Sequence, residues 1–255
     1  MTGGPDELTD PQRHALRIEI AVVLAVTFGL SAYTALLKLI EAVLLGLAGQ
    51  IVALNPRRSP FDLIDLGLNL AWVFQLLAWG ALGAYLLWRS GFSLPQIGLS
   101  RPRWRPDFLG GLGLAVLIGL PGLAFYLLAR ILGLNASVEP AELYDTWWRI
   151  PVLLLVAFAN GWAEEVIVVG FLFTRLRQLK VSPVAAVILT SLLRGLYHLY
   201  QGFGAGLGNL AMGLVFGYVY VRTGRLWPLI VAHALIDAVA FVGYALAAGH
   251  LNWLP

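Results

Sequence analysis

Two adjacent glutamates lie in the middle of an apolar stretch of the chain. Glu164 and Glu165 carry the only charges in PVLLLVAFANGWAEEVIVVGFLF, residues 151–173. A carboxylate deep in a membrane-spanning helix costs roughly 2.5–3.5 kcal/mol on insertion scales, so it needs a partner or a function. Adjacent helix positions point about 100° apart, so we expect one glutamate to enter a central site and the other to face a neighbouring helix. Asn160, four residues before Glu164, shares its face.

Two later apolar segments carry groups that can meet these glutamates. SLLRGLYHLY contains Arg194 and His198, and LIVAHALIDAVAFVG contains His233 and Asp237. The members of each pair are four residues apart, so each pair shares one face of a helix. We therefore predict one buried polar site built from three helices.

These residue types fit the chemistry of an activated water. Glu164 and His198 would bind a water between them, and the glutamate would take its proton. His233, oriented by Asp237, would donate a hydrogen bond to the oxyanion that forms when this water attacks an amide. Such a hydrolase needs no covalent nucleophile.

Glu165 and Arg194 fit a different role, because together they can form a buried ion pair that positions the helices. With Asn160 they are predicted as supporting residues of the site.

Zinc is the alternative to a metal-free site. Glu164, His198, His233 and Asp237 would supply four ligands of kinds that zinc accepts. No general base would then remain, and the chain has no HExxH motif. The chain also has no cysteine, which excludes thiolate ligands, a thiolate nucleophile and disulfides. We therefore predict no cofactor, with zinc as the alternative.

The composition places this site in a membrane. The 255 residues are 59% hydrophobic and 12% charged, with a mean hydropathy of +0.79. A soluble domain of this length would carry more charge on its surface. We predict an all-α, polytopic transmembrane helix bundle that contacts membrane lipids. The chain shows no nucleic-acid-binding module.

About seven membrane spans are predicted. A polar tail, residues 1–17, precedes a single transmembrane helical domain, residues 18–255. The first apolar run is either one long tilted helix or a span followed by an interfacial helix. The glycine-rich GFGAGLG reads as a turn before the sixth span. The predicted spans are 18–47, 63–88, 108–132, 151–175, 183–200, 209–221 and 226–248.

The distribution of Arg and Lys sets the expected orientation. Cytoplasmic loops are enriched in these residues. With the N-terminus inside, the loops predicted to face the cytoplasm hold most of them, including Arg101, Arg103, Arg105, Arg175, Arg177, Lys180, Arg222 and Arg225. We predict a multi-pass protein of the bacterial plasma membrane with a cytoplasmic N-terminus.

The three polar motifs resemble those of a known family. AEEVIVVG, LLRGLYHLYQG and AHALID, in this order on separate spans, look like the motifs of the CAAX protease and bacteriocin-processing (CPBP) family of intramembrane endopeptidases. The family pattern is EExxxR, FxxxH and HxxxN or HxxxD. The resemblance covers about residues 150–245, a protease-like core.

The resemblance implies a role for each matching residue. Glu164 corresponds to the glutamate that activates water with the help of His198, and His233 and Asp237 to the pair assigned to the oxyanion. The motif arginine is replaced by Val169, and the motif phenylalanine by Arg194. We expect Arg194 to supply from its own helix the positive charge lost at position 169.

The resulting prediction is an intramembrane endopeptidase, of the glutamic type rather than a zinc metalloprotease, acting on a membrane-associated peptide or protein, including a lipid-anchored one. The alternatives are a catalytically inactive scaffold or immunity protein of the same fold, and a transporter with a proton-coupled carboxylate relay. The missing inverted repeat weighs against transport.

Overall fold

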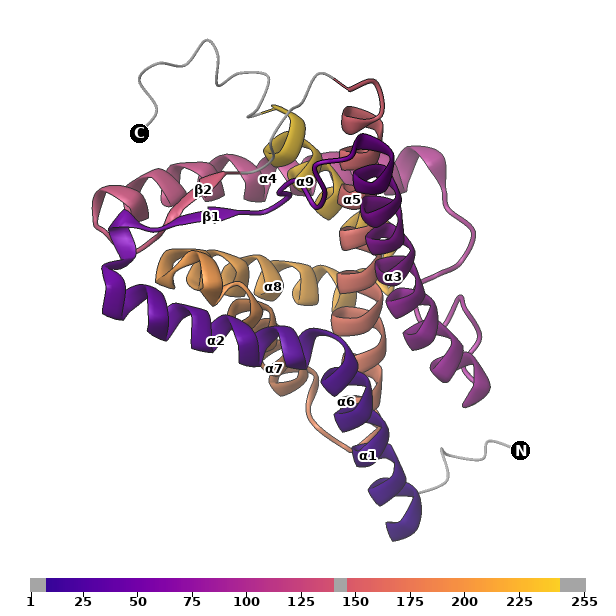
Figure 1. Cartoon of the computed structure of the whole chain (residues 1–255). Coiled ribbons are helices and arrows are strands. Elements are labelled where there is room, and N and C mark those ends of the chain that lie inside the picture. The colour runs from indigo at the N-terminus through magenta and orange to yellow at the C-terminus, as the bar shows by residue number, and fades with distance from the viewer. Residues whose placement is uncertain (1–7, 140–145, 244–255) are drawn as a thin grey trace.

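A computed structural model of the chain describes residues 8–139 and 146–243 and shows a helical bundle with one very small sheet (Figure 1). The predicted all-α, polytopic architecture is confirmed. The helices are α1 (Asp10–Val26), α2 (Phe28–Leu45), α3 (Asp62–Arg89), α4 (Trp104–Ile131), α5 (Arg149–Glu164), α6 (Phe173–Gln178), α7 (Pro183–Tyr197), α8 (Phe203–Thr223) and α9 (Trp227–Ala238). Short 3₁₀ turns are η1 (Leu47–Gly49) and η3 (Leu199–Gln201), and π-helical segments are η2 (Glu165–Leu172) and η4 (Val239–Gly243).

Within the described residues, six helices are long and apolar enough to cross a membrane. They cover residues 28–45, 62–89, 104–131, 149–178, 183–201 and 203–223. The protein is therefore an integral, multi-pass membrane protein. The seventh predicted span, 226–248, is described over Trp227–Gly243, which is shorter than the other six. Its last predicted residues, 244–248, lie outside the described part.

The helix formed by α5, η2 and α6 lies at the centre of the bundle. In the most apolar 18-residue stretch of this helix, 72% is buried by the rest of the protein, whereas the share for α4 is 6%. In Figure 1, α2, α4 and α8 run roughly parallel to one another, and α3 and α5 cross them steeply. Polar side chains on α5 and η2 therefore face other helices rather than lipid, which is the condition for keeping charges inside a membrane protein.

The first apolar run forms two helices that meet at Thr27. The backbone of Thr27 (φ −128°, ψ −124°) is not helical, and its hydroxyl donates to the carbonyl of Val23 at 2.7 Å. The side chain thus satisfies an acceptor that the end of α1 leaves open. α1 begins at Asp10, inside the predicted polar tail, because Thr9 and Gln12 form a capping box there.

The predicted turn GFGAGLG is wrong beyond its first residue. Gly202 (φ 123°) ends η3, and α8 starts at Phe203. A β-carbon at Gly206 would lie 2.5 Å from Leu199 Cδ2, and one at Gly204 would lie 2.5 Å from Ala129 Cβ. The glycines therefore allow α8 to pack closely against its neighbours rather than marking a turn.

A small sheet at one end of the bundle was not predicted. β1 (Ile51–Ala53) and β2 (Ser137–Glu139) form a parallel, two-stranded sheet. Just before β2, the amide of Ala136 donates to the carbonyl of Gln201 at 2.9 Å. The segment around β2 is therefore hydrogen-bonded to two loops that are distant from it in sequence, one at β1 and one at Gln201.

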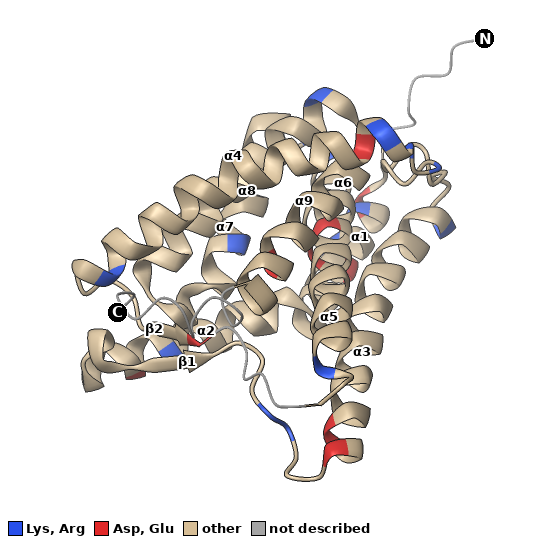
Figure 2. Ribbon diagram, turned by 90° about the horizontal axis from the view of Figure 1, so that it is seen from above, with Lys and Arg blue, Asp and Glu red and all other residues tan. Residues whose placement is uncertain are grey.

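A second contact joins the loop before α4 to the loop after α8, at the opposite ends of these two helices from the sheet. The amide of Leu226 donates to the carbonyl of Gly98 at 3.0 Å. Arg225 forms an ion pair with Asp107, with a distance of 2.5 Å between its NH2 and Oδ2. Figure 2 shows charged positions at many helix ends and a separate group of acidic positions inside the bundle.

Candidate active site

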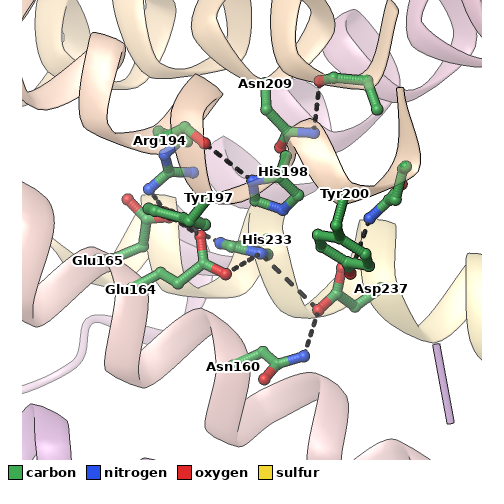
Figure 3. Close-up of polar contacts among 12 residues, drawn as sticks. Asn160, Glu164, Glu165, Arg194, Tyr197, His198, Tyr200, Asn209, His233 and Asp237 are labelled. Atoms are coloured by element: carbon green, nitrogen blue, oxygen red, sulfur yellow. Dashed lines mark hydrogen bonds and ion pairs between the residues drawn. The ribbon is translucent and has the colours of Figure 1, made fainter. Parts of the chain in front are cut away.

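The residues singled out in the sequence meet in the interior of the bundle (Figure 3). They come from three segments that are distant in sequence. Glu164 and Glu165 lie at the junction of α5 and η2, and Arg194 and His198 lie on α7 and at its C-terminal cap. His233 and Asp237 lie on α9. Glu165 and Arg194 are 0% exposed, and Glu164 and His233 are also buried.

Glu165 is shared by two partners. Its Oε1 accepts a hydrogen bond from NH2 of Arg194 at 2.6 Å and another from Nδ1 of His233 at 2.7 Å. The predicted pair between Arg194 and Glu165 is therefore confirmed. Val169, at the motif-arginine position, is buried among apolar residues of the core.

Glu164 lies on the other side of the His233 ring. Its Oε1 is 4.0 Å from Nε2 of His233, and its Oε2 accepts a hydrogen bond from the hydroxyl of Tyr197 at 2.6 Å. The two glutamates were expected to face different neighbours, but both approach one imidazole, at opposite nitrogens. The main chain changes from α- to π-helical geometry between them, a local change that is frequent at functional sites.

Asp237 completes the surroundings of His233. Its Oδ2 is 3.7 Å from Nε2 of His233 and accepts a hydrogen bond from Nδ2 of Asn160 at 3.2 Å. The sequence assigned the orientation of His233 to Asp237. This assignment is wrong in one respect, because the ring donates its direct hydrogen bond to Glu165. Asp237 faces the opposite nitrogen, and Asn160 contacts Asp237.

Among the described residues, one ring nitrogen of His198 has no hydrogen-bond partner. Its Nδ1 lies 3.0 Å from the carbonyl oxygen of Arg194. A carbonyl only accepts, so Nδ1 donates and Nε2 of the neutral ring is left as an acceptor. Within the described residues no direct hydrogen bond joins His198 and Glu164. The preceding residue, Tyr197, contacts Glu164 instead.

The buried ion pair of Arg194 and Glu165 has polar atoms without a hydrogen-bond partner among the described residues. Nε and NH1 of Arg194 and Oε2 of Glu165 have no hydrogen-bond partner among the described residues. The guanidinium lies over the ring of Phe216, 5.4 Å from its centroid. Unsatisfied buried polar groups are rare in proteins and mark places where stability is not the sole determinant of structure.

Tyr197 is the contact that sequence reasoning missed. It lies three residues after Arg194, so it shares the helix face that turns toward the glutamates. That spacing was the available signal, but a tyrosine in an apolar helix is also an ordinary packing residue, and nothing in the sequence separated these possibilities.

The described residues do not fit a metal ion in this arrangement. Among them, no group of three or more His, Asp or Glu side chains is placed so that it could hold one.

Comparison with known proteins agrees with the resemblance seen in the motifs. Residues 146–239 match the family model described as type II CAAX prenyl endopeptidase Rce1-like. A search of curated proteins and a search of solved structures each find no match.

Proposed function

We propose a function from one premise, that residues 146–239 match the family model described as type II CAAX prenyl endopeptidase Rce1-like. The family implies a protease acting on a peptide or protein substrate in the membrane. We propose that this chain is an intramembrane endopeptidase of the glutamic type, with Glu164, His198, His233 and Asp237 as its catalytic residues.

The observation that carries this proposal is the position of Nε2 of His233. It lies 4.0 Å from Oε1 of Glu164 and 3.7 Å from Oδ2 of Asp237. Both separations exceed a direct hydrogen bond and suit a bridging water or a substrate oxygen. Glu165 holds the other ring nitrogen, so the orientation of the ring is set from outside the reaction.

The catalytic steps follow from these positions. Glu164 takes a proton from a water, and the hydroxide adds to the carbonyl carbon of the scissile amide. In its protonated form, His233 donates from Nε2 to the oxyanion that develops. Glu164 then returns the proton to the leaving nitrogen as the C–N bond breaks. His198 offers Nε2 as an acceptor for the same water.

The central test is Glu164→Gln, which keeps the shape of the side chain and removes the base. Hydrolysis of a membrane-associated peptide should fall at least about a hundredfold. Glu41→Gln is the matched control, because Glu41 is an exposed glutamate of α2, and its activity should stay at the wild-type level.

The same variant separates the alternative functions. A scaffold or immunity protein would keep its partner binding in Glu164→Gln and would show no hydrolysis in the wild type. A transporter would show substrate flux across vesicles, with altered pH dependence in the variant. Hydrolysis that is unchanged in Glu164→Gln would contradict the assigned base.

Metal independence is tested separately. We expect activity to survive dialysis against a strong chelator, with no gain when zinc is added back. Loss of activity that zinc restores would show that the proposed chemistry is wrong.

The orientation of the chain is also part of the proposal. Arg101, Arg103 and Arg105 precede or begin α4, and Arg225 pairs with Asp107 close to them in space. By the positive-inside rule this end faces the cytoplasm. With it, we propose a cytoplasmic N-terminus and location in a bacterial plasma membrane. Reporter fusions to the loop at residues 179–182 should therefore be cytoplasmic.

A further inference from the structure

We propose that Tyr197 is a positioning residue for Glu164, holding the carboxylate so that Oε1 faces the reacting water. The proposal rests on the proposed hydrolysis and adds to it a residue at a variable position of the second motif, between Arg194 and His198.

The contact is short and buried. The Tyr197 hydroxyl donates to Oε2 of Glu164 at 2.6 Å, and Tyr197 is 5% exposed. Because Oε2 is engaged in this way, Oε1 is the oxygen that approaches Nε2 of His233. When Oε2 is hydrogen-bonded, the carboxylate is held in one orientation, in which Oε1 can act as the base. Without the Tyr197 hydroxyl, the carboxylate can rotate between several orientations.

The tyrosine ring is itself fixed from two sides. It lies 4.7 Å from the ring of His198 and 4.9 Å from the ring of Phe28, measured between centroids. Phe28 is the first residue of α2, directly after the break at Thr27, and its other neighbour is Trp79 of α3 at 5.4 Å. The amino-terminal helices, outside residues 146–239, therefore support a side chain that holds Glu164.

The experiment compares Tyr197→Phe with Tyr220→Phe. The first change keeps the ring and its stacking and removes only the hydroxyl. The second is the matched control, because Tyr220 is also buried and its hydroxyl donates to the carbonyl of Ile97 at 3.3 Å. We expect kcat of Tyr197→Phe to fall roughly ten- to a hundredfold, the size of a lost hydrogen bond to a charged group. KM should not change, because the hydroxyl contacts Glu164. Tyr220→Phe should match the wild type.

A spectroscopic measurement tests the contact without using activity. The infrared difference between wild type and Glu164→Gln isolates the carboxylate bands of Glu164. In Tyr197→Phe these bands should shift, because one oxygen loses a strong donor. They should not shift in Tyr220→Phe.

The outcomes separate this inference from the proposed function. Unchanged bands and unchanged kcat in Tyr197→Phe, with Glu164→Gln inactive, would overturn the role of Tyr197 and leave the protease intact. Shifted bands with unchanged kcat would also overturn the positioning role. A wild type without peptide hydrolysis would overturn the function, whatever the spectra show.

Discussion

Two fully buried arginines, Arg175 and Arg194, differ in how many of their nitrogens are hydrogen-bonded. Arg175 of α6 has every nitrogen bonded: Nε to Glu19 at 2.8 Å, NH1 to Gln178 at 2.8 Å, and NH2 to Ser90 at 2.8 Å and to the carbonyl of Leu86 at 3.1 Å. Arg194 of α7 has one bonded nitrogen, NH2, and its partner Glu165 is shared with His233.

The difference shows what each region is built to do. A cation with every nitrogen bonded, reaching α1 and α3, holds these helices together. A cation paired with one carboxylate, with two nitrogens that have no partner among the described residues, is costly in a buried site. The first arrangement is optimised for stability and the second is not, which is expected where chemistry takes place.

Breaking the interior pair should have the largest effect. Arg194→Phe removes the charge and leaves Glu165 buried with His233 as its remaining partner, at a cost of roughly 3–5 kcal/mol in unfolding free energy. We expect strongly reduced thermal stability in detergent and no peptide hydrolysis.

The double variant Val169→Arg with Arg194→Phe sharpens this result. It returns the charge to the position where the family motif has it, so it should be milder than Arg194→Phe alone in melting temperature and in activity. If both variants are equally inactive and equally unstable, the idea that Arg194 compensates for Val169 is wrong.

Removing the Arg175 side chain should have an intermediate effect of a different kind. Arg175→Leu removes four hydrogen bonds of a charged group, each worth about 1.5–3 kcal/mol where water does not replace it, so the melting temperature should fall. Activity per folded molecule should stay near the wild-type value, because Arg175 contacts none of the catalytic groups. The measurement is a melting curve combined with active-site-normalised hydrolysis. A large loss of activity in the folded fraction would contradict the purely structural role of Arg175.

The smallest effect is expected for Asn160→Ala. It removes one donor to Asp237, with a distance of 3.2 Å, and so about 0.5–1.5 kcal/mol of stability. Activity should fall by a few-fold, since Asp237 remains beside His233. Asn209→Ala is a suitable comparison, because the Asn209 amide bonds the carbonyl of Ala205 in its own helix.

Much of the fold and part of the site followed from the sequence. The cost of charge in an apolar segment pointed to Glu164, Glu165, His233 and Asp237, and four-residue spacing grouped each pair on one face. The ion pair of Glu165 with Arg194 followed from the same reasoning. Apolar length alone located the long helices.

What failed depends on interactions that no local pattern records. The change to π-helical geometry at Glu165 lets both glutamates approach His233, whereas a regular helix predicted separate faces. The break at Thr27 and the start of α8 at Phe203 depend on tertiary packing: one side-chain hydroxyl satisfies a carbonyl, and glycines admit neighbouring helices. The sheet joins two very short segments with no pattern of their own.

The small sheet also restricts how many times the chain can cross the membrane between β1 and β2. Residues 51–53 and 137–139 are hydrogen-bonded neighbours, so they share one compartment. The path between them runs through α3 and α4, and only an even number of passages returns it to the same side. Either both helices traverse the bilayer or neither does, and both have the length to do so. Accessibility labels placed at Ala53 and at Glu139 must therefore always report the same side.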